Sequence, residues 1–263
     1  MSKIISIANQ KGGVGKTTTA INLAASIAIS GKKVLLIDID PQGNASSGLG
    51  IAEDTKGVYE LMMGEANVEE VTCSTEIETL KIIPSRVDLT GAEIELVTRE
   101  SRETVLKQEL IHVKEYEFVV IDCPPSLGLL TLNALAVSNS VLIPMQCEYY
   151  ALQGLSHLLK TLKLVKKSIN PDLKVEGILL TMFDSRTLLA TQVKDQVQKY
   201  FSDFLLKSVI PRNVRLSEAP SHGKPIMLYA GRSRGADSYI ELAKEIISRS
   251  KTETKISLTG SAA

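Results

Sequence analysis

Short apolar runs rich in isoleucine and valine recur along the whole chain. Because these runs are apolar throughout and do not alternate with polar residues, they predict strands that are buried on both faces of a sheet. The runs cover residues 4–8, 34–37, 80–83, 118–121, 141–144, 177–181 and 205–210.

Between these runs, apolar residues recur at the three- and four-residue spacing of helices. The predicted helices cover residues 17–30, 131–138, 152–167, 187–201 and 237–249. Buried strands that alternate with helices are typical of an α/β fold, here a doubly wound, mainly parallel sheet flanked by helices. No repeat or linker interrupts the pattern, so residues 1–249 are predicted to form a single domain. Residues 250–263, polar and ending in small side chains, are predicted to form a disordered tail.

The sequence KGGVGKTT, residues 11–18, stands between the first predicted strand and the first predicted helix. Glycines let a backbone turn tightly and direct successive N–H groups at phosphate oxygens, and the helix that follows presents its positive end to them. The sequence therefore predicts a nucleotide phosphate loop. Its phosphate-binding residues are predicted to be Gly12, Gly13, Val14, Gly15, Lys16, Thr17 and Thr18.

Three side chains of this loop have separate predicted roles. Lys16 is expected to reach the β- and γ-phosphates, Thr17 to offer its hydroxyl to Mg²⁺, and Thr18 to bind a phosphate one step further along. The usual pattern is not fully met, because Gln10 occupies the position of its first glycine and a second lysine, Lys11, follows.

Two predicted strands end in carboxylates. Asp122 ends the run 118–121, the arrangement by which phosphate-loop proteins hold Mg²⁺, and Asp38 and Asp40 follow the run 34–37. We expect Asp38 to lie nearer the metal and Asp40 to orient or activate the attacking water. A single aspartate at a strand end is often only a helix cap. Three of them near a phosphate loop favour the metal-site interpretation.

Composition and charge narrow the setting. The 263 residues are 44% hydrophobic, enough for a sizeable core, and the three cysteines form no close pair. Neither a secretion signal nor a membrane-spanning run is visible, so the expected location is the cytoplasm. Net charge is zero, but between Arg186 and Arg234 nine basic residues stand against three acidic ones. The chain is therefore polarised along its length.

Four stretches together, KGGVGKTT, DIDPQGN, VVIDCPPSLG and IPRNVRLSEAPSHGKP, resemble the ParA and MinD family of P-loop NTPases with a deviant Walker A loop. The last stretch resembles the ParA/Soj partition branch. The resemblance implies that Lys11 contacts the nucleotide of a partner subunit and acts with Lys16 and Asp40 in catalysis. It also implies that Gly12 lies at the dimer seam and that Pro211 and Asn213 contact adenine.

The same resemblance implies a function for the whole chain. It implies an ATP- and Mg²⁺-dependent homodimer with slow, partner-stimulated ATPase activity. It further implies non-specific, nucleoid-associated DNA binding in the ATP state, and action with a DNA-bound ParB-like protein in chromosome or plasmid segregation. The basic segment is compatible with such DNA binding, since lysines and arginines neutralise backbone phosphates without reading bases. The candidate contacts are Lys194, Lys199, Lys207, Arg215 and Arg234.

Three alternatives share the nucleotide site. A MinD-like switch would end in a basic amphipathic helix that binds a membrane, which residues 251–263 do not resemble, so no membrane partner is expected. An iron–sulfur electron carrier would need bridging cysteines, whereas Cys123 is expected to be a small buried residue. A phosphate-loop metabolic enzyme would need a substrate pocket. Glu148, Tyr149 and Tyr150 could line one, although core or interface packing is the favoured interpretation for them.

Overall fold

One twisted sheet organises the chain, and the structure, a computed structural model, describes residues 2–111 and 113–259 of it. Within those residues the sheet has eight strands in the order β3-β4-β2-β5-β1-β6-β7-β8. All neighbouring strands are parallel except β3 and β4. The predicted doubly wound, mainly parallel sheet is thereby confirmed. The strands are β1 Lys3–Ile7, β2 Val34–Asp38, β3 Cys73–Ser74, β4 Leu80–Ile83, β5 Phe118–Asp122, β6 Ser140–Gln146, β7 Lys174–Phe183 and β8 Leu205–Pro211.

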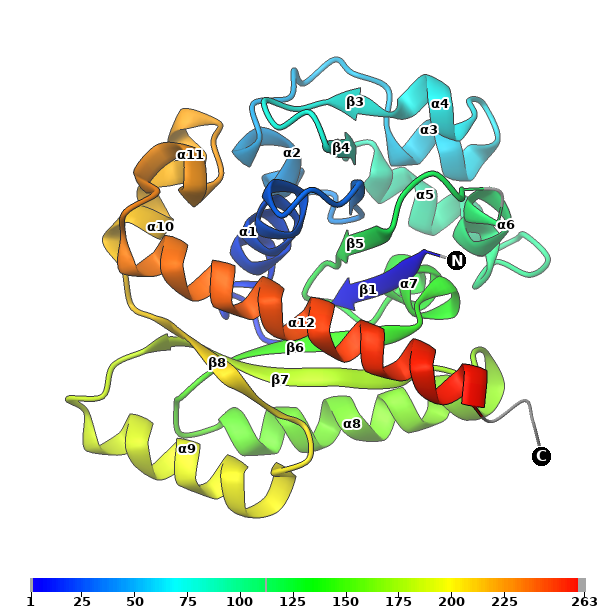
Figure 1. The fold of residues 1–263 in the computed structure, drawn as a ribbon. Coiled ribbons are helices and arrows are strands. Elements are labelled where there is room, and N and C mark those ends of the chain that lie inside the picture. The colour runs from blue at the N-terminus through cyan, green and yellow to red at the C-terminus, as the bar shows by residue number, and fades with distance from the viewer. Residues whose placement is uncertain (1, 112, 260–263) are drawn as a thin grey trace.

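Helices cover both faces of this sheet (Figure 1). One face carries α1 Lys16–Ile29 and α12 Arg234–Thr259, together with the shorter α2 Asn44–Gly48, α10 Val214–Glu218 and α11 Ile226–Ala230. The other face carries α3 Val58–Met63, α5 Leu89–Leu96, α6 Val105–Leu110, α7 Leu129–Val137, α8 Ala151–Ser168 and α9 Leu188–Phe201. A further short helix, α4 Val68–Val71, and a 3₁₀ turn, Ala219–His222, complete the described elements.

Each face of the sheet has its own apolar core, because successive side chains of a strand point to opposite sides. Leu36 of β2 and Val120 of β5 pack under α1 and α12, whereas Ile37 and Ile121 pack toward α3, α5 and α7. All five residues of β2 and all five of β5 are buried, as their unbroken apolar sequences predict.

The position of β1 decides where a ligand can bind. β1 lies between β5 and β6. The helix after β1, α1, covers one face of the sheet, and the helix after β5, α7, covers the other. In open α/β sheets the crevice at the carboxyl ends of such strands is the usual ligand site. The phosphate loop follows β1 directly, and Asp38 and Asp122 pair with each other in register at the ends of β2 and β5.

Several short elements of the structure were not predicted from the sequence. The pattern gave no sign of β3 or of the short helices α2 to α6, because elements of a few residues are set by tertiary contacts more than by periodicity. α12 continues beyond residue 249 to Thr259 and so enters the segment expected to form a tail, and the disorder expected there stays a prediction. The rest of that tail, residues 260–263, lies outside the described residues. Within the described part of the chain, no helix is both long and apolar enough to cross a bilayer.

Candidate nucleotide site

The loop between β1 and α1 has the backbone of an anion-binding turn. Gly13 and Gly15 have φ of 74° and 85°, a left-handed region in which side chains are strained. Gly15 is also the cap residue of α1, whose first turn contains no acidic side chain. The positive end of α1 is therefore free of a competing carboxylate from its own first turn.

Hydrogen bonds to two other strands, β6 and β7, hold this loop in place. The Asn9 amide donates to the carbonyl of Pro144 in β6 at 2.7 Å, and the Asn9 side-chain oxygen accepts from the Lys11 N–H at 3.0 Å. The Thr181 hydroxyl of β7 donates to the carbonyl of Val14 at 2.8 Å. The loop is therefore fixed before any nucleotide enters it.

Lys16 lies inside the loop and is only 7% exposed. Its ammonium donates to the Lys11 carbonyl at 3.2 Å, so the side chain folds back over the loop. Burial lowers the pKa of Lys16, and the charges of Asp122 and Asp40 oppose that change. Phosphate oxygens held by the loop would meet a desolvated cation, whose attraction is stronger than in water.

Asp38 anchors the loop that follows β2. Its carboxylate accepts from the Ser46 N–H at 2.9 Å, from the Ser46 hydroxyl at 2.8 Å and from the Asp40 N–H at 3.2 Å. Burial raises the pKa of Asp38 to about 6, although the hydrogen bonds from Ser46 act in the opposite direction. Asp38 thus sets the shape of the loop that carries Asp40. Asp40 itself is 6% exposed and accepts from the Gln42 N–H at 3.0 Å.

Asp122 is fully buried, and neither of its carboxylate oxygens has a hydrogen-bond partner. Burial raises its pKa well above the ordinary range, and the charge of Asp38 adds to that rise. The nearby Thr17 hydroxyl and the charge of Lys16 oppose it. An unpaired buried carboxylate is costly unless a cation or donor satisfies it.

These residues fit a Mg²⁺ ion. Asp122 offers unused oxygens, and Thr17 places a hydroxyl in the first turn of α1. Among the described residues, no group of three His, Cys, Asp or Glu side chains could hold a metal alone. This suits Mg²⁺, which protein sites commonly hold through one or two carboxylates together with substrate phosphates and water. Asp38 is the weaker candidate ligand, because its oxygens already bind Ser46 and Asp40.

A cavity of about 220 Å³ opens beside the phosphate loop. It is lined by Gly15 and Thr18 from the loop side, and by Pro211 and Asn213 after β8. Asn213 also caps α10, since its side-chain oxygen accepts from the Arg215 N–H at 2.9 Å. The structure therefore brings the two expected adenine residues to the phosphate loop from nearly two hundred residues away in sequence. Sequence reasoning missed Met182, a lining residue with a left-handed φ of 49°.

Lys11 lies on the outer side of the loop, where its ammonium forms an ion pair with the Glu148 carboxylate. The two side chains are 44% and 43% exposed. Tyr149 and Tyr150 next to Glu148 are 77% and 68% exposed, so within one protomer they are not core residues. No pattern in the sequence indicated the pairing of Lys11 with Glu148.

The basic residues predicted to contact DNA are surface residues on three different parts of the fold. Lys194 and Lys199 lie on α9, Lys207 lies on β8, and Arg215 and Arg234 lie on α10 and at the start of α12. β8 is the edge strand of the sheet, and these residues lie on it and on the helices before and after it in sequence, not in a row on one helix (Figure 1). Arg215 forms an ion pair with Glu218 at 2.8 Å, and the Lys194 ammonium lies over the ring of Phe183.

Comparison with known proteins decides the family. A family profile described as "AAA domain" matches residues 2–175. The sporulation initiation inhibitor protein Soj of Bacillus subtilis is 61% identical over 249 residues, which cover 94% of this chain and 98% of that protein. The chromosome-partitioning ATPase Soj of Treponema pallidum is 54% identical, with 95% and 98% covered. The chain belongs to the ParA/Soj family of P-loop ATPases.

A solved structure supports the same fold for this ParA/Soj chain. Cobyrinic acid a,c-diamide synthase from Mycobacterium smegmatis, solved with ADP and magnesium, superposes with a TM-score of 0.84 at 36% identity, over 96% of this chain and 97% of that one. The three cysteines of the ParA/Soj chain are free. Cys123 is fully buried, as expected for a small packing residue.

Proposed function

We propose that this protein is an ATP-dependent dimerising switch with slow ATPase activity that acts in chromosome or plasmid segregation. The observation that carries the proposal is the unpaired carboxylate of Asp122, buried at the strand end beside a preformed phosphate loop. A buried charge of this kind is explained when a cation and an anionic nucleotide complete the site. Membership of the ParA/Soj family, whose relatives are named as partitioning ATPases, supports the same conclusion.

Each residue of the site has a task in this proposal. Lys16 and the loop N–H groups bind the phosphates. Thr17 and Asp122 would hold Mg²⁺, which would supply positive charge to stabilise the transferring phosphoryl group. Asp40 orients the attacking water and takes its proton. Asp38, through Ser46, keeps that loop in position. The adenine base enters the cavity formed by Pro211 and Asn213.

Dimerisation uses Lys11. The Lys11 side chain is half exposed on the outer side of the loop, so a second subunit that faces the loop can present its nucleotide to it. In that arrangement Lys11 leaves Glu148 and binds phosphate oxygens across the seam, where a second cation stabilises the transition state. Loss of the γ-phosphate removes this charge, and the dimer then separates.

DNA binding follows from the dimer in this proposal. Two copies of the basic surface residues around the β8 edge would contact backbone phosphates, with affinity that falls steeply as salt rises. Because a dimer carries both surfaces, the two weak DNA contacts act together and give a higher overall affinity. A DNA-bound ParB-like protein is the proposed stimulator of hydrolysis, and the proposed location is the nucleoid.

The first test is molecular mass by light scattering with ADP and with ATP. Asp40→Ala, which slows turnover, should be a dimer with ATP and a monomer with ADP. Lys16→Ala and Gly12→Val should stay monomeric with both nucleotides, because the first loses the phosphate contact and the second places a side chain in the seam. A mass that ignores nucleotide in every variant would refute the dimer switch.

DNA binding is tested separately, by titrating ATP-bound Asp40→Ala onto two unrelated duplexes at low and high salt. Similar affinities for both duplexes and a steep loss with salt are expected. Vesicle co-sedimentation in the same buffers checks the membrane alternative. Binding to vesicles without binding to DNA would favour that alternative.

A further inference from the structure

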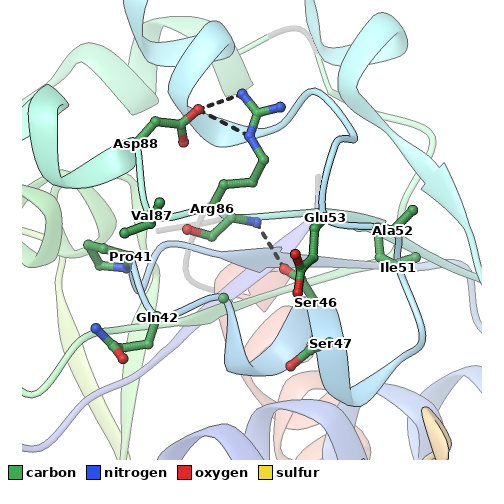
Figure 2. Close-up of a pocket in the computed structure, with 12 residues that line it drawn as sticks. Pro41, Gln42, Ser46, Ser47, Ile51, Ala52, Glu53, Arg86, Val87 and Asp88 are labelled. Atoms are coloured by element: carbon green, nitrogen blue, oxygen red, sulfur yellow. Dashed lines mark hydrogen bonds and ion pairs between the residues drawn. The ribbon is translucent and has the colours of Figure 1, made fainter.

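A second pocket lies beside the loop that follows β2 (Figure 2). It is formed by the loop after β2, the segment after α2 and the loop after β4. Its volume is about 400 Å³, within the ordinary range of small-ligand sites, about 300–1,000 Å³. No residue lines both this pocket and the adenine cavity. The two are separate sites.

The walls of this pocket are partly apolar. Pro41 and Val87 lie on one side of it and Ile51 and Ala52 on the other, as Figure 2 shows. Val87 is 77% exposed, unusual for a valine that has no partner surface. A hydrocarbon chain entering the pocket would cover this surface.

The polar part of the pocket contains the carboxylate of Glu53. The Glu53 carboxylate is exposed and turns toward Ser46 and Ser47 (Figure 2). Among the described residues, no hydrogen bond or ion pair of Glu53 is found. The pocket therefore offers a carboxylate that is not neutralised.

Arg86 is the one basic residue in the lining, and its guanidinium is already fully engaged. It forms ion pairs with Glu60 and Asp88, and it donates to the carbonyls of Asp54 and Thr55. Figure 2 shows its side chain extending away from Ser46 toward Asp88. An anionic ligand would find no free cation in the lining, so the pocket favours a cation.

An independent feature also marks this pocket. Within the described part of the chain, buried side-chain oxygens without a hydrogen-bond partner belong to Asp122 and to two residues of this lining, Ser85 and Asp88. Ser85 is only 5% exposed. Unpaired buried polar atoms are uncommon and typical of sites that hold a ligand. The first such residue lies in the metal site, and the other two lie here.

We propose that this pocket binds an aliphatic cation, a primary ammonium or a guanidinium group on a short hydrocarbon chain. The charged group pairs with the Glu53 carboxylate and donates to the unpaired hydroxyl oxygen of Ser85. The chain packs against Val87 and Ile51. A free amine and a lysine or arginine side chain of another protein share this chemistry.

Hydrogen bonds from two residues that line the pocket, Ser85 and Gln42, connect it to the nucleotide site. The Ser85 N–H donates to the Ser46 hydroxyl at 2.9 Å, and that hydroxyl in turn donates to Asp38. Gln42, another lining residue, donates its N–H to Asp40. A ligand that moves either loop therefore shifts Asp40. This coupling rests on the proposed function, whereas binding of the cation does not.

The test uses two cationic probes, agmatine and the peptide acetyl-Gly-Arg-Gly-amide, titrated into the nucleotide-free full chain by calorimetry. The same peptide with citrulline in place of arginine is the uncharged control. Glu53→Gln should weaken binding of both cationic probes about tenfold, the value of one charge-assisted hydrogen bond. Glu69→Gln, which changes an exposed carboxylate outside the pocket, should leave binding unchanged.

Ser85→Ala is a second variant that keeps the fold, because the hydroxyl that it removes has no partner. It should also weaken the cationic probes. Binding of agmatine alone assigns the site to a free amine, and binding of the peptide alone assigns it to a protein side chain. Absence of saturable binding, equal binding of the citrulline peptide, or equal binding by Glu53→Gln would overturn the site.

ATP turnover with saturating probe separates the coupling from the site. A change of about twofold or more in the native chain, absent in Glu53→Gln, supports the coupling. Probe binding without a change in turnover rejects the coupling and keeps the site. If the chain hydrolyses no ATP at all, the proposed function fails while the binding result stands.

Discussion

Asp122→Asn should stabilise the nucleotide-free protein while abolishing its response to Mg-ATP. The Asp122 carboxylate is fully buried, lacks a hydrogen-bond partner and faces Asp38 in register. The charge of Asp122 therefore lowers the free energy of unfolding of the nucleotide-free protein, and it stabilises the protein only when a cation binds. An asparagine keeps the shape of the side chain and removes that charge.

The magnitude follows from the two carboxyl groups at these strand ends. The pKa of Asp38 is raised from 3.8 to about 6, which corresponds to about 3 kcal/mol of stability lost when the group ionises. Burial raises the pKa of Asp122 well above its ordinary range, so its ionisation also lowers the stability of the free protein. A buried amide without full hydrogen bonding costs about 1–3 kcal/mol. Relative to a cost of about 3 kcal/mol, the net gain is at most about 2 kcal/mol, or a Tm increase of up to about 8 °C.

The pH dependence has a definite sign. Because the folded-state pKa of Asp122 lies above its unfolded value, the cost is absent well below pH 3.8, where both states are protonated, and is still small at pH 4. It grows as pH rises from there toward the folded-state pKa. The advantage of Asp122→Asn should therefore be largest at pH 8 and should shrink steadily toward pH 4.5.

The assay is thermal and urea unfolding in EDTA at pH 4.5, 6 and 8, repeated at pH 8 with Mg-ATP at about 100 times its Kd. Mg-ATP should stabilise the native chain by about 2.7 kcal/mol and Asp122→Asn by nearly nothing. Asp172→Asn, at an exposed aspartate, is the matched control and should behave as the native chain does. A gain that is independent of pH, or lower stability than the native chain at pH 8, would refute the reasoning.

Three further variants test the surrounding structure. Glu148→Gln frees Lys11 from a half-exposed ion pair worth about 0.2–1 kcal/mol. The ATP-dependent dimer should therefore form at about two- to fivefold lower protein concentration in light scattering. Unchanged dimerisation would show that this ion pair does not compete with the dimer contact of Lys11. Thr181→Val leaves a loop carbonyl unpaired and should lower the free energy of unfolding by about 1–3 kcal/mol in urea titrations, unless that carbonyl finds another donor. Gly57→Ala places a Cβ 2.0 Å from the Pro84 carbonyl oxygen. This clash should lower Tm by about 6 °C or more. An unshifted Tm would contradict the close contact.

The sequence by itself predicted most of the strands, the longer helices and the phosphate loop, because each of these depends on a pattern of residues that are close together in the chain. The runs that became β2 and β5 are apolar throughout, and such runs have few alternatives to a buried strand. Glycines and a lysine at fixed spacing between a strand and a helix likewise leave one interpretation for residues 11–18. The position of Asp122 at the end of a buried strand was predicted for the same reason.

Tertiary structure decided what depends on residues far apart in the chain. Strand order places Asp38 beside Asp122, and only that pairing makes two buried carboxylates share one site. Lys11 meets Glu148, and the loops after β2 and β4 meet to form the second pocket around Ser85. No local pattern encodes these meetings, because they depend on how the whole sheet packs. Periodicity reports which face of an element is buried, and the fold alone determines what it is buried against.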